Sequence, residues 1–351
     1  MPRLDPYLCW ANPDEITRRG KRRMSPGTPA FESTAPCSLA SGSEIHAGTR
    51  IGRYALQHIV GRGGMGVVVA AHDSELGRQV AIKLVASNDE QARRRLMREA
   101  QAMARLSHPN VVTVHDVIRS GDRAGIVMEL VDGDDLATWG EARPRGWRAV
   151  VAAYVQAARG LAAAHQAGLL HRDFKPSNAL IGRDGVVRVT DFGLVRSMNP
   201  SDREPREPDE LDSAIQDGLL LTLTRTGAMI GTPAYMAPEQ HGGEPLDART
   251  DQWALACSLY TGLYGQLPFA GASYQELSSA VMTGTVRPEP TDAPVPRSIR
   301  LAIRRALAMR PADRFASMDE LIAALSATAC AGSRRGPRRR SRRTRTRVLA
   351  T

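Results

Sequence analysis

The stretch HRDFKPSN, residues 171–178, decides how this sequence is interpreted. It gathers His171, Arg172, Asp173, Lys175 and Asn178 directly before the apolar run ALI. Charged side chains rarely crowd beside a buried strand unless a reaction or a bound ion requires them there. The fold must therefore bring an acid, a cation and an amide to one place for a chemical reason.

A second acidic group follows the next predicted strand, because Asp191 comes directly after VVRVT. Amide and carboxylate oxygens such as those of Asn178 and Asp191 suit magnesium, which also binds phosphate oxygens. Asp173 is then available to orient a hydroxyl nucleophile and accept its proton, while Lys175 neutralises charge on the transferred group. An in-line phosphoryl transfer needs these groups and few others.

Two upstream features fit a phosphate-binding role. GRGGMGVV (residues 61–68) places glycines between two predicted strands, where backbone amides can approach an anion. Dinucleotide-binding turns use the same spacing but open a helix, whereas this loop leads into a strand. Lys83, in VAIK, is one of three lysines among 47 basic residues. A buried lysine needs an anionic partner, and Glu99 on the following predicted helix is the best candidate.

The order of the predicted elements divides the chain into two lobes, 53–130 and 131–328. Strands are expected over 54–60, 67–73, 78–85, 111–118 and 125–130. Helices are expected from Ser87, whose capping box includes Glu90, and over 149–168, 250–264, 297–309 and 318–329. This pattern predicts an α+β protein with a small antiparallel sheet lobe and a larger helical lobe, and ligands commonly bind between such lobes.

Both ends and one internal segment have compositions typical of unfolded chain. Residues 1–48 are expected to form a disordered leader, and the acidic residues 197–221 a flexible insertion. Residues 333–351 contain nine arginines and no acid, so the rest of the chain carries about +1 of the net charge of +10 (10 − 9). This tail is either a solvated end or an arm that contacts a polyanion or an anionic membrane.

The cysteines and the apolar segments indicate the compartment. Cys9, Cys37, Cys257 and Cys330 form no CxxC pair, which argues against a disulfide framework or a zinc site and favours a reducing cytosol. No run approaches the roughly 18 apolar residues of a membrane span, and the N-terminus lacks the pattern of a signal peptide. We expect a cytoplasmic protein, the alternative being that a downstream membrane segment has been lost.

Together these motifs resemble those of the bacterial eukaryotic-like (Hanks-type) serine/threonine protein kinases. Residues 53–325 contain, in the order of that family, the glycine loop, VAIK, HRDFKPSN, DFG at 191–193 and APE at 237–239. Any one motif is weak, but five in order argue strongly against a chance match. Phe174 stands where leucine is usual, an apolar exchange that leaves the chemistry intact. The resemblance implies the two-lobed protein kinase fold over 53–328.

The resemblance also implies a role for each matched residue. Lys83 contacts the α- and β-phosphates of ATP and pairs with Glu99, Asp173 is the catalytic base, and Lys175 lies near the γ-phosphate. The implied ATP-binding residues are Gly61, Arg62, Gly63, Gly64, Met65, Gly66, Val68, Ala81, Lys83, Met128, Glu129, Val131, Asp135 and Leu180. The implied ligands of Mg²⁺, with Mn²⁺ as the alternative metal, are Asn178 and Asp191.

Within the ATP site, Glu129 and Val131 offer hinge backbone groups to adenine and Asp135 matches the ribose-contacting position. Val68, Ala81 and Leu180 enclose the base, or are plain core residues.

Substrate and regulation follow from the same resemblance. Lys175, two residues after Asp173, and Thr232 in GTPAYMAPE favour serine and threonine over tyrosine. The expected partners are protein substrates and the protein itself, by autophosphorylation at Thr224 and Thr226, and a homodimer is left open. Arg172 is a cation that a phosphate on this segment could order. The alternative is that these threonines are ordinary polar loop residues.

Two other functional classes share parts of this pattern. A pseudokinase scaffold would usually lack Lys83, Asp173 or Asp191, and all three are present. A small-molecule phosphotransferase of kinase-like fold usually lacks the GTPxYxAPE segment, which here spans 231–239. We therefore predict an active, magnesium-dependent serine/threonine protein kinase of bacterial signalling.

Some of the matched residues are expected to be structural. Arg314 is expected to pair with Glu239, Asp251 to anchor the backbone of the HRD motif, and Cys257 to be a small core residue.

Overall fold

The computed structural model describes residues 48–63, 66–86, 97, 100–101, 103–120, 123–192, 232–291 and 293–331. The chain divides into a sheet unit, made of residues up to 104 together with 113–130, and a helical unit, made of residues 105–112 and those from 131 onward. Residues 1–47 of the predicted leader, the acidic insertion, the arginine-rich tail and the capping box at Ser87 lie outside the described residues.

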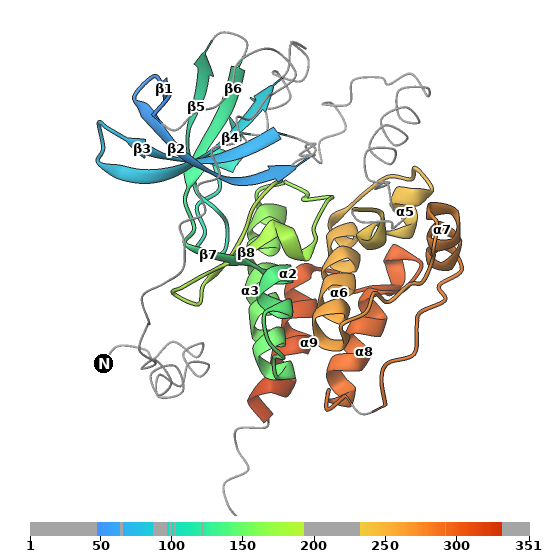
Figure 1. Ribbon diagram of the computed structural model, residues 1–351. Coiled ribbons are helices and arrows are strands. Elements are labelled where there is room, and N and C mark those ends of the chain that lie inside the picture. The colour runs from blue at the N-terminus through green and yellow to red at the C-terminus, as the bar shows by residue number, and fades with distance from the viewer. Residues whose placement is uncertain are drawn as a thin grey trace, which may run out of the picture. The chain divides into compact units, whose positions relative to one another are not determined.

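The described part of the sheet unit is a six-stranded antiparallel sheet with the strand order β1-β2-β3-β4-β6-β5 (Figure 1). Its strands are β1 (Arg50–Ile51), β2 (Tyr54–Gly63), β3 (Gly66–Asp73), β4 (Arg78–Ala86), β5 (Val114–Ser120) and β6 (Arg123–Glu129). The two strands predicted over 67–73 and 78–85 form a hairpin, β3–β4, whose turn ends at Gly77 with φ of 62°, a conformation that favours glycine.

One face of this sheet carries the apolar core of the unit. Val67, Val69, Val80, Ile82 and Val127 are all buried there, in alternate positions on three neighbouring strands. Residues directly opposite in antiparallel strands share a face, and successive residues alternate between faces. Burial of each such side chain contributes about 1.5–3 kcal/mol, so this alternation fixes which residues point away from the core.

The strand predicted over 111–118 begins later than expected, at Val114. Val111 instead forms an isolated parallel bridge with Val189, and the Val112 N–H donates to the Val189 carbonyl at 2.9 Å. Residues 105–112 are therefore grouped with the helical unit. An apolar run is buried equally well in the six-stranded sheet and beside Val189 in the helical unit. The sequence alone therefore could not show which of the two Val111 and Val112 pair with.

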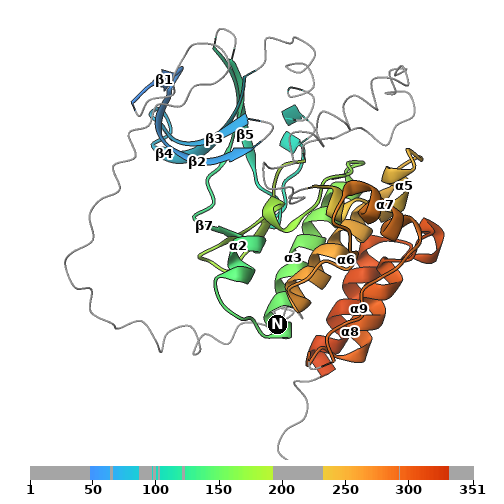
Figure 2. The ribbon, with the colours of Figure 1, turned by 45° about the vertical axis from the view of Figure 1, so that its right-hand side comes forward.

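The helical unit is built around α3, α6, α8 and α9, which run side by side in both views (Figures 1 and 2). Its helices are α2 (Leu136–Glu141), α3 (Trp147–Gln166), α5 (Pro238–His241), α6 (Ala248–Tyr264), α7 (Tyr274–Met282), α8 (Arg297–Ala306) and α9 (Met318–Ala331), with 3-10 turns η2 (Pro176–Asn178), η4 (Thr232–Tyr235) and η5 (Pro311–Asp313). The described residues also form a small antiparallel sheet of β7 (Gly133–Asp135), β8 (Ala179–Gly182) and β9 (Val187–Val189).

The four helices predicted in this unit are confirmed, with shifted ends. The sequence S-x-x-E at Ser317 and Glu320 also predicts a capping box, and half of it is present. Ser317 Oγ accepts from the Glu320 N–H at 3.3 Å, but the Glu320 carboxylate accepts the N–H of Ala316 and not that of Ser317. Cys257 is fully buried in α6, as predicted, and burial raises the pKa of its thiol. No described helix is long and apolar enough to cross a membrane.

A buried ion pair joins α5 to the turn before α9, as predicted. Arg314 Nη1 and Nη2 donate to the two carboxylate oxygens of Glu239 at 2.6 and 2.8 Å, and Thr250 Oγ1 donates to the same carboxylate at 2.9 Å. The remaining guanidinium hydrogens donate to three backbone carbonyls, those of Ala308, Arg249 and Met309. Both charges are thus compensated inside the protein, which a buried ion pair requires.

Removing one charge of this pair should strongly destabilise the helical unit. We expect Glu239→Gln to lower the free energy of unfolding by about 3–5 kcal/mol, because Arg314 would be left charged and buried. Chemical denaturation followed by circular dichroism measures this change. The matched control is Glu75→Gln, whose side chain is 66% exposed beside Arg53 and should contribute less than about 1 kcal/mol. Equal losses in the two variants would contradict this prediction.

Candidate active site

The predicted glycine loop is a hairpin between β2 and β3. Gly63 lies opposite Gly66 as the last pair before the turn, and Gly66 has φ of 132°, a conformation that side chains rarely adopt. A Cβ atom added at Gly61 would meet nothing within 4 Å, so packing does not explain a glycine there. Arg62 is exposed on the same strand, and Gly64 and Met65 lie outside the described residues.

The predicted nucleotide-binding residues of the sheet unit share one face of the sheet. Val68 lies opposite Lys83, and Lys83 lies opposite Ile126 on the next strand. Ala81 lies opposite Met128, two residues along from that row. All of them occupy the face opposite the apolar core, because strand residues alternate between faces. The fold therefore brings Val68, Ala81, Lys83 and Met128 together.

Lys83 is a charged residue that is buried on this face. It is 5% exposed, which a lysine tolerates only with an anionic partner. Its predicted partner Glu99 lies outside the described residues, so the Lys83–Glu99 pair stays a prediction.

The two predicted hinge residues fall in different units. Glu129 ends β6, and its N–H donates to the Thr113 carbonyl at 2.9 Å while its carboxylate accepts from the Thr113 N–H at 3.4 Å. The Glu129 N–H is therefore used within the sheet unit. Val131 belongs to the helical unit.

The HRDFKPSN loop brings two predicted catalytic residues and one predicted metal ligand into contact. Lys175 Nζ lies 3.0 Å from Asp173 Oδ2, and Asn178 Nδ2 donates to the Asp173 carbonyl at 2.8 Å. The second carboxylate oxygen, Asp173 Oδ1, is buried and has no hydrogen-bond partner within the described part of the chain. An acceptor atom of this kind suits a hydroxyl donor supplied from outside the protein.

Asp251, on α6, anchors the backbone of this loop, as predicted. Its two carboxylate oxygens accept the N–H groups of His171 and Arg172 at 2.9 and 2.8 Å, and His165 Nε2 lies 2.7 Å from Oδ2. Burial acts to raise the pKa of Asp251, but the hydrogen bond from His165 and the backbone N–H of His171 outweigh it and lower the pKa. Asp251 therefore remains a buried acceptor for the loop.

Arg172 has a strained backbone, with φ of 64°. A residue with a side chain pays about 1–2 kcal/mol in this left-handed region, so the surrounding contacts must impose it. Two of those contacts are hydrogen bonds to the backbone of Arg172. The Arg172 N–H donates to Asp251, and the Arg172 carbonyl accepts from Gln240 Nε2 at 2.9 Å.

His171 is fully buried beneath the loop. Its ring contacts Phe174 and Phe192, at centroid distances of 5.7 and 4.7 Å, and its Nε2 lies 3.0 Å from the Thr190 carbonyl. A carbonyl accepts only, so Nε2 carries the proton. Burial is the main reason that the pKa of His171 lies below its usual value, and the ring is neutral at pH 7.

The two predicted metal ligands are brought close by backbone pairing. The Thr190 N–H donates to the Asn178 carbonyl at 2.9 Å, and Asp191 follows directly with φ of 56°. Since Nδ2 of Asn178 is bound to Asp173, the amide oxygen is the end left for a ligand. No group of three His, Cys, Asp or Glu residues forms a metal cluster in the described residues. One amide and one carboxylate fit Mg²⁺, which usually completes its shell with water and phosphate oxygens.

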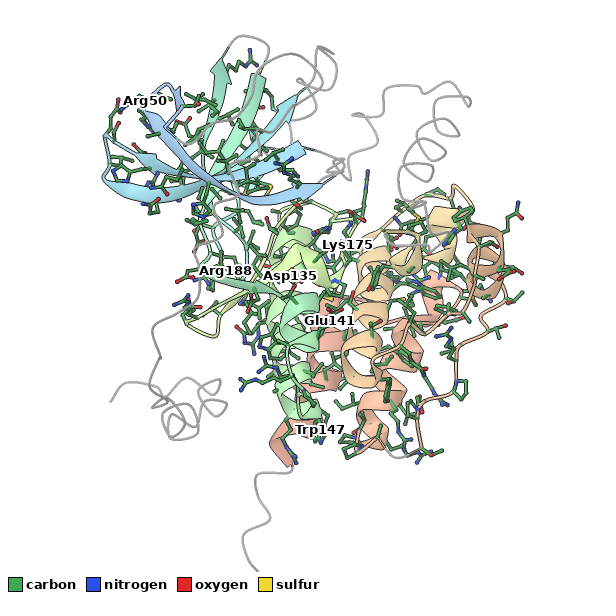
Figure 3. The ribbon with its side chains drawn as sticks, in the orientation of Figure 1. Arg50, Asp135, Glu141, Trp147, Lys175 and Arg188 are labelled. Atoms are coloured by element: carbon green, nitrogen blue, oxygen red, sulfur yellow. The ribbon has the colours of Figure 1, made fainter. Side chains whose placement is uncertain are left out.

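Asp135 and Leu180 lie opposite each other on β7 and β8. The Asp135 carboxylate caps α2, accepting the N–H groups of Ala137 and Thr138 at 2.8 and 2.9 Å. Figure 3 labels Asp135 and Lys175, both at the end of the helical unit that carries β7 and β8. Asp135 thus has a structural role besides the ribose contact implied by the resemblance.

Two residues that hold the catalytic loop escaped prediction. His165 and Gln240, which bond to Asp251 and Arg172, were missed because these contacts join residues 86 and 68 positions apart and follow no local pattern. The candidate phosphorylation sites Thr224 and Thr226 lie outside the described residues.

Comparison with known proteins identifies the family. The protein kinase domain family matches residues 54–324, so the chain belongs to that family. It is 36% identical to a probable serine/threonine-protein kinase of Streptomyces coelicolor, over 77% of this chain and 39% of that protein. It is 34% identical to serine/threonine-protein kinase PknE of Mycobacterium tuberculosis (81% and 48%) and 35% identical to PknB of Mycolicibacterium smegmatis (78% and 42%).

These findings confirm the predicted family and the predicted α+β fold class. The chain spans about two fifths of the length of the first of these relatives.

The buried neutral His171 should make stability depend on pH. Its pKa is lowered in the folded protein, whereas an unfolded histidine titrates near pH ~6.5, so below that pH the unfolded chain binds the extra proton. The free energy of unfolding should therefore fall with decreasing pH, by up to about 1.4 kcal/mol per pH unit from this group. Denaturation series between about pH 7.5 and 5.5 measure the slope.

The variant His171→Phe isolates this contribution. It keeps an aromatic ring beside Phe174 and Phe192 but binds no proton. We expect lower stability at about pH 7.5, where the bond to Thr190 is lost, and a shallower pH dependence than that of the wild type. Parallel slopes in the two proteins would show that His171 is not the group responsible.

Proposed function

We propose that this protein is an active serine/threonine protein kinase, which transfers the γ-phosphate of ATP to hydroxyl groups of proteins. The observation that carries the proposal is the arrangement around Asp173. One carboxylate oxygen pairs with Lys175 at 3.0 Å, the main chain is fixed by Asn178, and Oδ1 lacks a partner among the described residues. The names of the bacterial relatives support the same activity.

In this proposal Asp173 Oδ1 accepts a hydrogen bond from the substrate hydroxyl and orients it. The hydroxyl oxygen forms a bond to the γ-phosphorus, the bond from that phosphorus to the β–γ bridging oxygen breaks, and ADP leaves. The hydroxyl proton passes to Asp173, as general base catalysis requires. Lys175, held beside Asp173, balances negative charge on the transferred group.

Asn178 and Asp191 would hold Mg²⁺, with Mn²⁺ as the alternative. The metal would supply charge neutralisation at the phosphates. Lys83 would contact the α- and β-phosphates, with Glu99 as its partner, and the shared face of Val68 and Ala81 would contact adenine. The burial of Lys83 and the common face of these residues support this assignment.

We further propose regulation by autophosphorylation at Thr224 and Thr226 within bacterial signalling. A phosphate there would be attracted to the guanidinium of Arg172, whose backbone is tied to Asp173 through one peptide bond. Protein substrates are the expected partners.

Magnesium-dependent transfer from labelled ATP tests the proposed function. The wild type should phosphorylate itself and a generic basic protein on serine or threonine, and Asp173→Asn should lose about 10²–10⁴-fold in rate. The matched control Asp313→Asn changes an exposed aspartate on η5 and should keep full activity. Folded wild type that binds ATP without any transfer would support a non-catalytic scaffold instead.

Mapping the phosphorylated residues tests the regulatory part separately. After incubation with ATP, mass spectrometry should find phosphate on Thr224 or Thr226, and Thr224→Ala combined with Thr226→Ala should slow transfer to other substrates. The variant Thr222→Ala, in the same segment, is the control and should behave as the wild type. Phosphate found solely at other positions would contradict this assignment.

A further inference from the structure

The peptide bond that precedes Asp173 is held from an element outside its own loop. Gln240, on α5, donates from Nε2 to the Arg172 carbonyl at 2.9 Å. That carbonyl belongs to the same planar peptide group as the N–H of Asp173, so fixing one fixes the orientation of the other. Gln240 therefore acts on the backbone from which the proposed base extends.

The neighbouring peptide groups are fixed by other side chains. Asp251 accepts the N–H of Arg172, which belongs to the preceding peptide, and Asn178 donates to the carbonyl of Asp173, which belongs to the following one. Between these two anchors lies the left-handed φ of Arg172, which costs free energy and would relax without restraint. The bond from Gln240 restrains the peptide at which this relaxation would rotate Asp173.

The other end of the same amide is also bound. Gln240 Oε1 accepts the N–H of Ala237 at 3.0 Å, at the start of α5. The Ala237 N–H can only donate and the Arg172 carbonyl can only accept, so the two bonds determine which amide end faces which partner. One side chain thus links the end of the segment containing Thr232–Tyr235 to the loop that carries Asp173.

We propose that Gln240 is a positioning residue for phosphoryl transfer, which orients the Arg172–Asp173 peptide and couples it to Ala237. This inference rests on the proposed function. It differs from a capping role alone, because a cap needs only the oxygen that accepts from Ala237, whereas the positioning role needs the nitrogen that donates to Arg172.

Gln240→Glu separates the two roles. A glutamate still accepts the N–H of Ala237, and capping boxes use Glu and Gln alike. Its second oxygen, however, cannot donate to the Arg172 carbonyl when ionised, and two acceptors would face each other. We expect kcat to fall on the order of 10- to 100-fold, the scale of a small displacement of a reacting group. The KM for ATP should stay within about twofold, because Gln240 touches none of the proposed ATP-binding residues.

The pH profile adds a readout that a purely structural role would not change. A glutamate beside a carbonyl can donate again once it is protonated, so the activity of Gln240→Glu relative to wild type should rise as the pH falls from about 8 to 6. Gln240→Met, which removes both bonds at similar length, should show a comparable loss of kcat without this recovery. It also keeps the test valid if the glutamate variant does not fold.

The matched control is Gln156→Glu. Gln156, on α3, is bound in the same two-ended way, with Nε2 donating to the Gly185 carbonyl at 3.3 Å and Oε1 accepting the Val187 N–H at 3.1 Å. It should change kcat by less than about twofold although it loses an equivalent bond. Thermal melting of each variant establishes that the protein assayed is folded.

The outcomes distinguish this inference from the proposed function. An active wild type with an unchanged kcat in Gln240→Glu, or with an activity ratio that does not rise at lower pH, overturns the positioning role alone. A wild type that transfers no phosphate overturns both. An active wild type, a slow Gln240→Glu with acid recovery and a near-normal Gln156→Glu would establish the positioning role.

Discussion

The buried carboxylate of Asp251 is the interaction on which the catalytic loop depends. A carboxylate that is 1% exposed is stable only where donors replace its water, and it receives them from His165 and from two consecutive backbone N–H groups of the loop. Those two bonds hold Arg172 in a conformation that it would not adopt by itself. The geometry of Asp173 thus originates on α6, about 80 residues later in the chain.

In the sheet unit, the alternation of side chains between the two faces of the sheet positions the proposed nucleotide contacts. Strands β3 and β4 send Val69, Val80 and Ile82 into the apolar core and Val68, Ala81 and Lys83 to the other face. A shift of one residue in register would exchange the two sets and bury the lysine in the core, at prohibitive cost. The core therefore fixes the row of proposed nucleotide contacts as firmly as it fixes the sheet itself.

Local patterns account for most of what could be predicted from the sequence. Periodicity located the long helices and most of the strands, and the scarcity of lysine singled out Lys83 before its burial was known. Long-range pairing could not be predicted. Val111 was assigned to a strand of the six-stranded sheet, and Gln240 was not recognised because glutamine is equally common on exposed surfaces. A side chain that bonds to a distant backbone carbonyl leaves no trace in spacing or hydrophobicity, so only the folded chain reveals it.

The buried thiol of Cys257 reports whether α6 is folded. Its thiol is sealed within α6, six residues after Asp251, and its raised pKa suppresses the reactive thiolate. Modification at this position therefore requires α6 to open, and opening α6 also releases the carboxylate that holds the catalytic loop. The rate at which Cys257 reacts with a thiol reagent therefore measures local unfolding of α6, the helix on which the position of Asp173 depends.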